Sequence, residues 1–218
     1  MSKGAETRQA VLDEAARVAS RVGLGGLTIG SLAASTQLSK SGLFAHFQSK
    51  ESLQLQLLEH TRARFIDLVV RPALAAPRGE PRVRELFRRW LAWDADALPG
   101  GCLFIVASAE FDAQPGPVRE RLAQDQRDWL DMIAQVFRTG IAEGHFHPDA
   151  DPEQFAFDLQ GTILTYHHAS RLLGDPDAAA RATRAFEALL AAAQNPAARR
   201  PTPRRPVARR PTTGRPAS

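Results

Sequence analysis

The stretch TIGSLAASTQLSKSGLFAHFQSKE, which runs from Thr28 to Glu51, decides the fold of this chain. It contains three residues that favour helix N-termini, Thr28, Ser39 and Ser49, because each side-chain oxygen can accept a hydrogen bond from a backbone N–H of the next turn. Three starts this close together predict short helices joined by tight turns. A helix from Ser39 to about Phe47 is too short to be stable alone in water. We therefore expect its neighbours to hold it and to present it to a partner.

The residues around this short helix complete a helix-turn-helix unit. Apolar residues recur at helical spacing over residues 5–22, which predicts an amphipathic first helix that the glycines after it end. A second helix is expected from the Thr28 cap to about Thr36, followed by a turn of about three residues. On the third helix, Leu43 and Phe47 are expected to face the protein. The outward face then carries Lys40, Ser41, Phe44 and Ala45.

The remainder of the chain also has helical periodicity. Ser49 starts a long linker helix over residues 49–71, and Pro72 is expected to close it. Further helices are predicted at about 81–97, 101–112, 118–143, 152–173 and 176–193, and no segment alternates with period two over a strand length. The predicted fold class is all-α, with a helix-turn-helix domain at residues 1–48 and a helical regulatory and dimerisation bundle at residues 49–195.

Charge divides the chain into two parts. Seven of the 28 basic residues follow Glu187, the last acidic residue; the remaining 21 face 24 acidic ones, so the predicted folded part is mildly acidic. Residues 196–218 repeat Arg and Pro and lack the apolar residues needed to offset the entropy cost of ordering, which predicts a disordered tail. The tail is either an accessory that contacts DNA phosphates or a solvated segment with no required role.

Composition also excludes several classes of protein. No apolar run approaches the ~18 residues that span a bilayer, and the N-terminus has no apolar signal-peptide centre, so we expect a cytoplasmic protein without membrane partners. The sequence shows no nucleophile accompanied by a base and an orienting group, and it shows no phosphate loop. We therefore do not expect an enzyme. His145 and His147 lie close together, but no further ligands occur at a usual spacing, so neither a metal nor another cofactor is expected.

Residues 28–53 closely resemble the DNA-binding signature of the TetR family of transcriptional regulators. The matching residues are Thr28, Ile29, Leu32, Ala33, Leu38, Ser39, Lys40, Leu43, His46, Phe47, Ser49, Lys50, Glu51 and Leu53. Two positions depart from the family pattern. Gln37 replaces a turn glycine, where a positive φ is often wanted, and Phe44 replaces a tyrosine whose hydroxyl often reaches a phosphate. Both departures are expected to alter how this chain reads or grips DNA.

The residue types agree with what the resemblance implies. Helix N-termini at Thr28 and Ser39 suit phosphate groups, and Lys40 and Lys50 add positive charge. The candidate DNA contacts are Thr28, Ser39, Lys40, Ser41, Phe44, His46 and Lys50. For the three caps, structural capping and phosphate contact can coexist. His46 is equally consistent with a packing role beside Phe47.

The C-terminal region offers candidates for a ligand site. Aromatic residues are scattered over several predicted helices, and most are expected to form the core; Trp90, Phe104 and Trp129 are candidates for lining a cavity. Cys102, the single cysteine, is either a small buried hydrophobic residue or, less favoured, a redox sensor at a helix start.

Together these features predict a TetR-like transcriptional repressor. By resemblance, it works as a homodimer through its last two helices, at about 152–173 and 176–193, and a small-molecule effector releases it from operator DNA. Two alternatives remain: a helical small-molecule-binding protein with a vestigial helix-turn-helix, and a nonspecific DNA binder that uses the Arg-rich tail.

Overall fold

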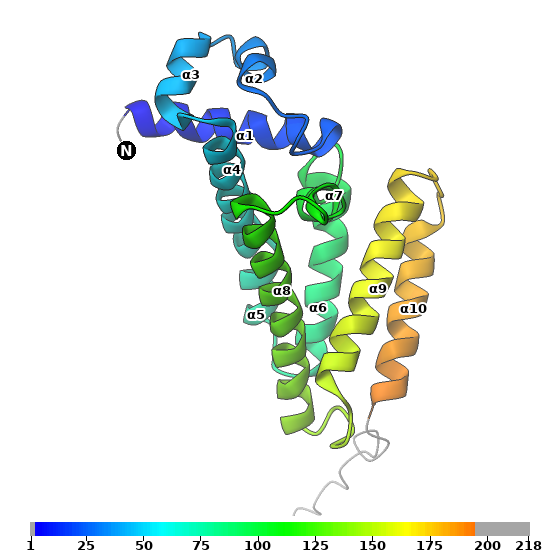
Figure 1. Ribbon diagram of the computed structural model, residues 1–218. Coiled ribbons are helices and arrows are strands. Elements are labelled where there is room, and N and C mark those ends of the chain that lie inside the picture. Colours follow the sequence, from blue (N-terminus) through cyan, green and yellow to red (C-terminus); the bar gives the residue numbers. More distant parts are fainter. Residues whose placement is uncertain (1–2, 195–218) are drawn as a thin grey trace, which may run out of the picture.

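The three caps of the Thr28–Glu51 stretch start helices where the sequence predicts them. In the computed structural model, which describes residues 3–194, α2 (Ile29–Thr36), α3 (Lys40–Phe47) and α4 (Lys50–Phe65) follow one another (Figure 1). Each capping oxygen accepts a hydrogen bond from the N–H three residues on, at Ser31, Gly42 and Ser52 respectively. Local hydrogen bonding therefore sets the boundaries of all three helices.

The first three helices form a unit that we call the head. The helix α1 (Lys3–Val22) packs against α2 and α4, and α2 packs against α3. Leu32, Leu43 and Phe47 are fully buried in the head. In the turn before α3, Gln37 has φ 59° and ψ 20°, the left-handed region that favours glycine. The turn thus keeps the geometry of a glycine position although a side chain occupies it.

The linker helix extends beyond its predicted end. After α4, the chain makes a π-helical turn, η1 (Ile66–Val70), and continues as α5 (Arg71–Ala75). The prediction that Pro72 closes the helix is therefore wrong. A proline inside a regular helix has no N–H and clashes with the carbonyl four residues back. Here the Arg71 N–H bonds to the Ile66 carbonyl five residues back, and this wider turn admits the proline ring.

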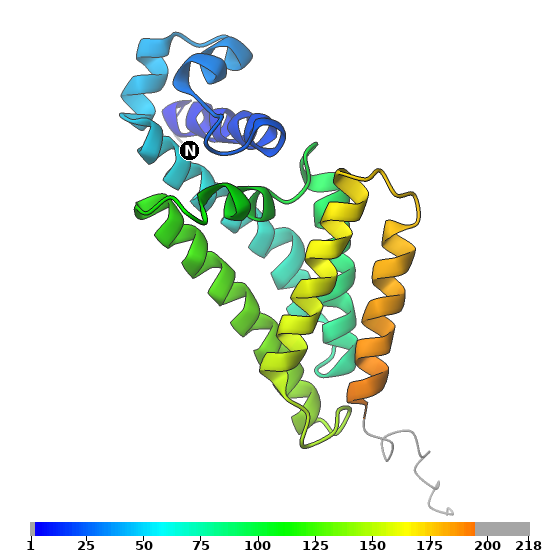
Figure 2. The same cartoon turned by 45° about the vertical axis from the view of Figure 1, so that its right-hand side comes forward.

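The remaining helices match the predicted ones closely and, with α4, η1 and α5, form the body. They are α6 (Glu80–Ala92), η2 (Trp93–Ala97), α7 (Leu103–Phe111), α8 (Pro117–Ala142), α9 (Pro152–Arg171) and α10 (Ala178–Ala193). The views in Figures 1 and 2 place the head at one end of the body and α9 beside α10 along one side. No strand occurs within residues 3–194, and the all-α prediction is confirmed. The predicted tail at 196–218 lies outside the described residues.

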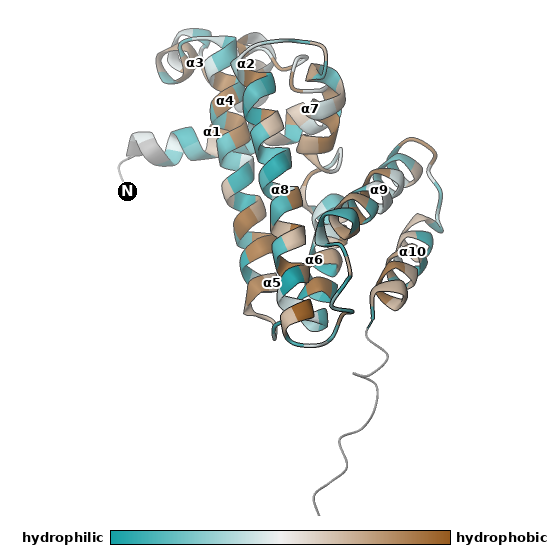
Figure 3. Ribbon diagram, turned by 60° about the horizontal axis from the view of Figure 1, so that its bottom comes forward, coloured by the Kyte–Doolittle hydropathy of each residue, from teal (hydrophilic) through white to brown (hydrophobic). Residues whose placement is uncertain are grey.

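Aromatic side chains connect the helices of the body. Phe137 stacks on Phe146 and Phe155 at ring-centre distances of 4.3 and 4.2 Å, and Phe87 of α6 stacks on Phe186 of α10 at 4.1 Å. Figure 3 shows hydrophobic and hydrophilic residues alternating along the helices, as in amphipathic helices that bury one face. Over the described residues, no helix combines the length and apolar character needed to cross a membrane.

Candidate functional site

One face of α3 is exposed to solvent. Lys40, Ser41 and Phe44 all face solvent, and the Phe44 side chain is 57% exposed. Leu43 and Phe47, on the opposite face of the same helix, are fully buried. An aromatic ring left in water on so short a helix is costly unless a partner covers it. The helix is therefore anchored on one side and presented on the other, as its sequence predicts.

The other candidate DNA contacts already have partners within the head. Thr28 exchanges hydrogen bonds with Ser31 in a capping box, and the Ser39 hydroxyl lies 3.1 Å from that of Ser41. The Lys50 ammonium donates to the carbonyl of Gly25, which joins the start of α4 to the turn after α1. His46 is half-buried, with its ring 6.2 Å from that of Phe47. DNA contact by these residues stays a prediction.

A cavity of about 210 Å³ opens inside the body. The linker segment α4–η1 forms one wall, and α6, α7, α8 and α9 form the others. The structure places Trp90, Phe104 and Trp129 in this wall, although their role in ligand binding stays a prediction. Phe65 lies among the aromatic rings, with centres 5.1 Å from Trp129 and 6.4 Å from Phe104. Such a mainly apolar cavity suits a small organic ligand.

Polar groups also line the cavity, and the sequence alone predicted none of Arg62, Asp125, Asp128, Gln126 and Gln160 as lining residues. Arg62 of α4 pairs with Asp125 and Asp128 of α8. Elsewhere, the Trp129 indole N–H donates to the Gln160 side chain at 3.0 Å. The sequence signal for these residues is weak, because charged residues on an amphipathic helix usually belong to its solvated face.

Polar side chains join α1 of the head to the middle of α4, at what we call the α4 joint. Asp13 of α1 contacts His60 Nε2 at 2.9 Å and Arg64 Nη1 at 3.1 Å, both on α4. The amide nitrogen of Gln9 lies 2.9 Å from His60 Nδ1. The α4 joint is therefore a network of side chains.

The head also contacts α7 and the loop before it, at what we call the α7 joint, where two backbone N–H groups bond to side chains. The Gly100 N–H donates to the Ser20 hydroxyl at 3.1 Å, and the Gly25 N–H donates to Glu110 Oε1 at 2.8 Å. A Cβ on Gly100 would overlap the Ser20 carbonyl oxygen, and one on Gly25 would overlap Glu110 Oε1. Both glycines let the end of α1 approach α7 and the loop before it.

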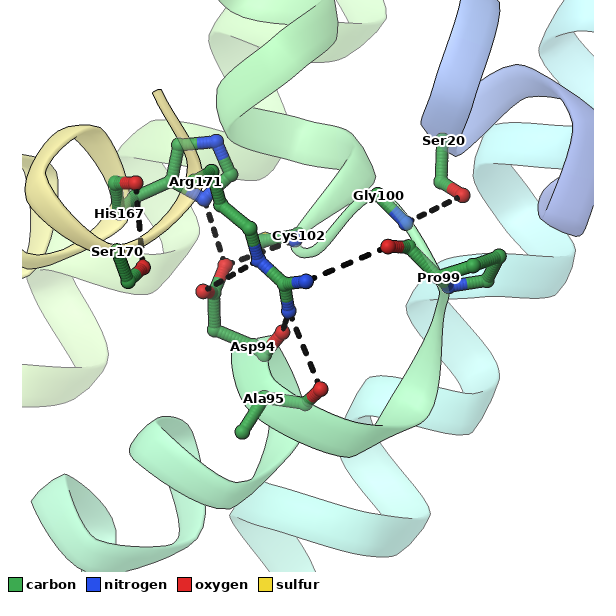
Figure 4. Close-up of polar contacts among 9 residues, drawn as sticks. All are labelled: Ser20, Asp94, Ala95, Pro99, Gly100, Cys102, His167, Ser170 and Arg171. Carbon is green, nitrogen blue, oxygen red and sulfur yellow. Dashed lines mark hydrogen bonds and ion pairs between the residues drawn. The ribbon is translucent and has the colours of Figure 1, made fainter. Parts of the chain in front are cut away.

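Asp94 ties the loop of the α7 joint to α9 (Figure 4). Its side chain is fully buried; Oδ1 accepts from the Cys102 N–H at 2.8 Å and lies 2.7 Å from His167 Nδ1, and Oδ2 is 3.5 Å from Arg171 Nε. Arg171 also donates to the backbone carbonyls of residues 94, 95 and 99. Burial alone would raise the pKa of Asp94, but His167, the Cys102 N–H and Arg171 together hold that pKa below its ordinary value.

The candidate redox and metal-binding residues, Cys102 and His145, have ordinary structural surroundings. Cys102 is buried in the cavity wall, and burial raises the pKa of its thiol to about 11, so the unreactive thiol form dominates at neutral pH. His145 accepts a hydrogen bond from the Glu80 N–H. Among residues 3–194, no group of three or more His, Cys, Asp or Glu side chains is arranged to hold a metal ion.

Two family models match the chain and together cover most of it. The model for bacterial regulatory proteins of the tetR family matches residues 11–57. The model for the tetracyclin repressor-like C-terminal domain matches residues 79–186. The first match includes α2 and α3 of the head, and the second includes most of the body. No sequence among the curated proteins matches the chain significantly.

Solved structures with the same fold are numerous. A TetR transcriptional regulator from Chloroflexus aurantiacus J-10-FL is 26% identical, with a TM-score of 0.77 over 88% of this chain and 96% of that one. SCO4454, a TetR-family transcriptional regulator from Streptomyces coelicolor, is 22% identical, with a TM-score of 0.73 over 87% and 97%. AibR in complex with isovaleryl coenzyme A and operator DNA is 22% identical, with a TM-score of 0.62 over 74% and 85%.

Proposed function

The chain belongs to the TetR family of bacterial regulatory proteins, and we propose that it is a transcriptional repressor that a small-molecule effector releases from its operator. Members of this family are DNA-binding regulators with a ligand-binding C-terminal domain, and they are not enzymes. The observation that carries the proposal is the presentation of α3, with Phe44 exposed and Leu43 and Phe47 buried behind it.

In this proposal α3 enters the major groove of operator DNA. Lys40, Ser41 and Phe44 supply the base or phosphate contacts, and Gly42 and Ala45 keep the outer surface of the helix small. The Phe44 ring, without a hydroxyl, can contact a thymine methyl group but cannot donate to a phosphate.

A homodimer would place two copies of α3 on a roughly palindromic site. The exposed face of α9 supports this. Phe157 is 71% exposed, Leu164 lies two turns further along the same face, and a Cβ on Gly161 between them would meet nothing within 4 Å. Leu172 and Leu173 after α9 are also exposed. A second copy of α9 and α10 would cover this apolar face.

The cavity supplies a route from effector to DNA. Its wall includes Arg62 of α4 and Ile66 and Val70 of η1. The N-terminal end of α4 follows α3 of the head directly. A ligand that fits only one position of α4 would shift the separation of the two α3 helices in the dimer. A ligand that bound both positions equally would not regulate.

DNA binding tests the proposal directly. We expect the full chain to prefer DNA from upstream of its own gene over random DNA, and Lys40→Ala to weaken that binding about tenfold without lowering the melting temperature. Arg127→Ala, which removes one exposed positive charge from α8, is the matched control and should bind normally.

Two further tests address the role of the tail and the homodimer. A chain without residues 196–218 should keep its sequence preference and show only a flatter dependence on salt. If the truncated chain showed no preference for any sequence over random DNA, the repressor proposal would be wrong. Phe157→Glu should give a monomer by light scattering, whereas Leu74→Glu, at an exposed apolar position on α5, should leave the dimer intact.

A further inference from the structure

The polar end of the cavity is an ion-pair cluster that joins two helices. Arg62 of α4 places Nε 3.2 Å from Asp125 Oδ1 and Nη2 2.9 Å from Asp128 Oδ2, and both carboxylates belong to α8. Arg121, one turn before Asp125 on α8, places its Nε 3.0 Å from the Asp125 carboxylate. Gln124 donates to Asp128 Oδ1 at 2.8 Å. Of the two arginines, only Arg62 lines the cavity, so the cavity itself faces two carboxylates and one guanidinium.

The two sides of this cluster differ in how easily they can leave it. The Asp125 side chain is 7% exposed, whereas that of Arg62 is 40% exposed and has a long flexible stem. A buried carboxylate without a partner is costly, but an arginine that turns into water is not. Burial raises the pKa of Asp125 although Arg121 and Arg62 act to lower it, so the arginines compensate this carboxylate incompletely.

The rest of the cavity wall is mainly apolar, with four aromatic residues and two glutamines: Phe65, Trp90, Phe104, Trp129, Gln126 and Gln160. Phe65 lies at the centre of an edge-to-face cluster, with its ring 5.1 Å from Trp129 and 6.4 Å from Phe104. Aromatic faces attract cations as well as apolar groups. A volume of about 210 Å³ is the share of roughly seven water molecules, which suits one ring with a short side chain.

We propose that the cavity binds a compact organic cation, an amine on an aromatic or apolar body, whose charged group replaces Arg62 on Asp125 and Asp128. The ligand body lies against Phe65, Phe104 and Trp129. An anionic ligand would have to displace both carboxylates from Arg62 and leave Asp125 buried with one partner fewer. A neutral ligand would leave the Arg62 pairs intact and gain only apolar contact.

The replacement of Arg62 by the cationic group of the ligand also changes how α4 is held. The regulatory consequence of this change rests on the proposed function. Arg62 of α4 pairs with two carboxylates of α8, so its replacement removes two ion pairs between α4 and α8. The ligand makes the same contacts with α8 but none with Arg62. It therefore binds best where α4 is released, which is the differential affinity that regulation requires.

Three probes of similar shape test the proposal on the full chain: 2-phenylethylamine, 2-phenylethanol and 3-phenylpropanoate. We expect the amine to raise the melting temperature most and to bind about tenfold more tightly than either of the others. Arg62→Gln removes the competing cation and should tighten amine binding severalfold. Asp128→Asn should abolish the preference for the amine, whereas Asp131→Asn, at an exposed position on the same helix, should change nothing.

Equal or tighter binding of the alcohol or the acid would overturn the proposal, as would an absence of stabilisation by all three probes. An amine preference that Arg62→Gln and Asp128→Asn both leave unchanged would overturn it as well, because the cation would then bind elsewhere. Operator binding is measured separately without any probe. Sequence-specific binding there upholds the proposed function whichever probe binds, and its absence contradicts that function without bearing on the ligand class.

Discussion

The α4 joint and the α7 joint connect the same head to the same body by different kinds of contact. At the α4 joint, Asp13, His60 and Arg64 meet through side chains that can reorient. At the α7 joint, the backbone at Gly100 lies against the Ser20 carbonyl of the head with no room for a Cβ, and Gly25 of the head lies against the Glu110 carboxylate. The side-chain pairs of the α4 joint can adjust their geometry, whereas the Gly100 contact fixes the spacing between two backbones. We infer that the Gly100 contact is the stricter of the two, so that a change there costs more stability.

Gly100→Ala tests this difference most severely. Its Cβ would overlap the Ser20 carbonyl oxygen, a backbone atom that moves only with α1 as a whole. We expect a loss of about 3 kcal/mol in the free energy of unfolding, measured by urea denaturation, together with faster proteolysis of the turn after α1. Gly4→Ala is the control, since nothing lies within 4 Å of the added Cβ, and it should be neutral. A neutral Gly100→Ala would mean that the α7 joint is as compliant as the other.

Asp94→Asn tests the support behind the α7 joint. It keeps the shape of the side chain but removes the charge that faces His167 and Arg171. Because Arg171 is partly exposed, we expect a moderate cost of about 2 kcal/mol in the free energy of unfolding at neutral pH.

The pH dependence of Asp94→Asn has a definite sign. The folded-state pKa of Asp94 lies below the ordinary value of 3.8, so its stabilising contribution is present above that value and is lost as the pH falls through the folded-state pKa. The stability difference between the two proteins should therefore be full at neutral pH and close as the pH falls below 3.8 and through the folded-state pKa. A constant difference across this range would show that the cost is one of packing and not of charge.

Contacts close in sequence were predictable, and those distant in sequence were not. Thr28, Ser39 and Ser49 start helices by bonding to residues three positions away, so the sequence alone contains the evidence. Asp94 lies on a segment that reads as an amphipathic helix with a solvated acidic face, and its partners His167 and Arg171 are more than 70 residues away. Nothing local distinguishes this buried aspartate from an exposed one.

The cavity and the linker helix also combine features that the sequence predicts with features that it does not predict. Large aromatic residues suggested Trp90, Phe104 and Trp129 as cavity residues, and the structure places them together. Arg62 and Asp125 escaped notice because they meet only when α4 packs on α8. The prediction at Pro72 was wrong because a π-helical turn precedes the proline and admits its ring. Composition does not reveal such a turn.

A pair of substitutions at Gly25 and Glu110 sharpens the comparison within the α7 joint. A Cβ on Gly25 would overlap a carboxylate oxygen, which can move, so Gly25→Ala should cost only about 1 kcal/mol in the free energy of unfolding. Glu110→Ala removes the acceptor of the Gly25 N–H and should cost a similar amount. The double variant should cost clearly less than the sum, since the clash disappears with the side chain. Additive costs would show that the two residues do not meet in solution.

Asp13→Asn should have the smallest effect. The Asp13 side chain is 47% exposed, so its pairs with His60 and Arg64 are screened by water, and an asparagine oxygen can still accept one of their hydrogen bonds. We expect a cost of about 0.5 kcal/mol in the free energy of unfolding and an operator affinity within about twofold of the parent. If Asp13→Asn instead matched Gly100→Ala in stability, the α4 joint would be the strict one.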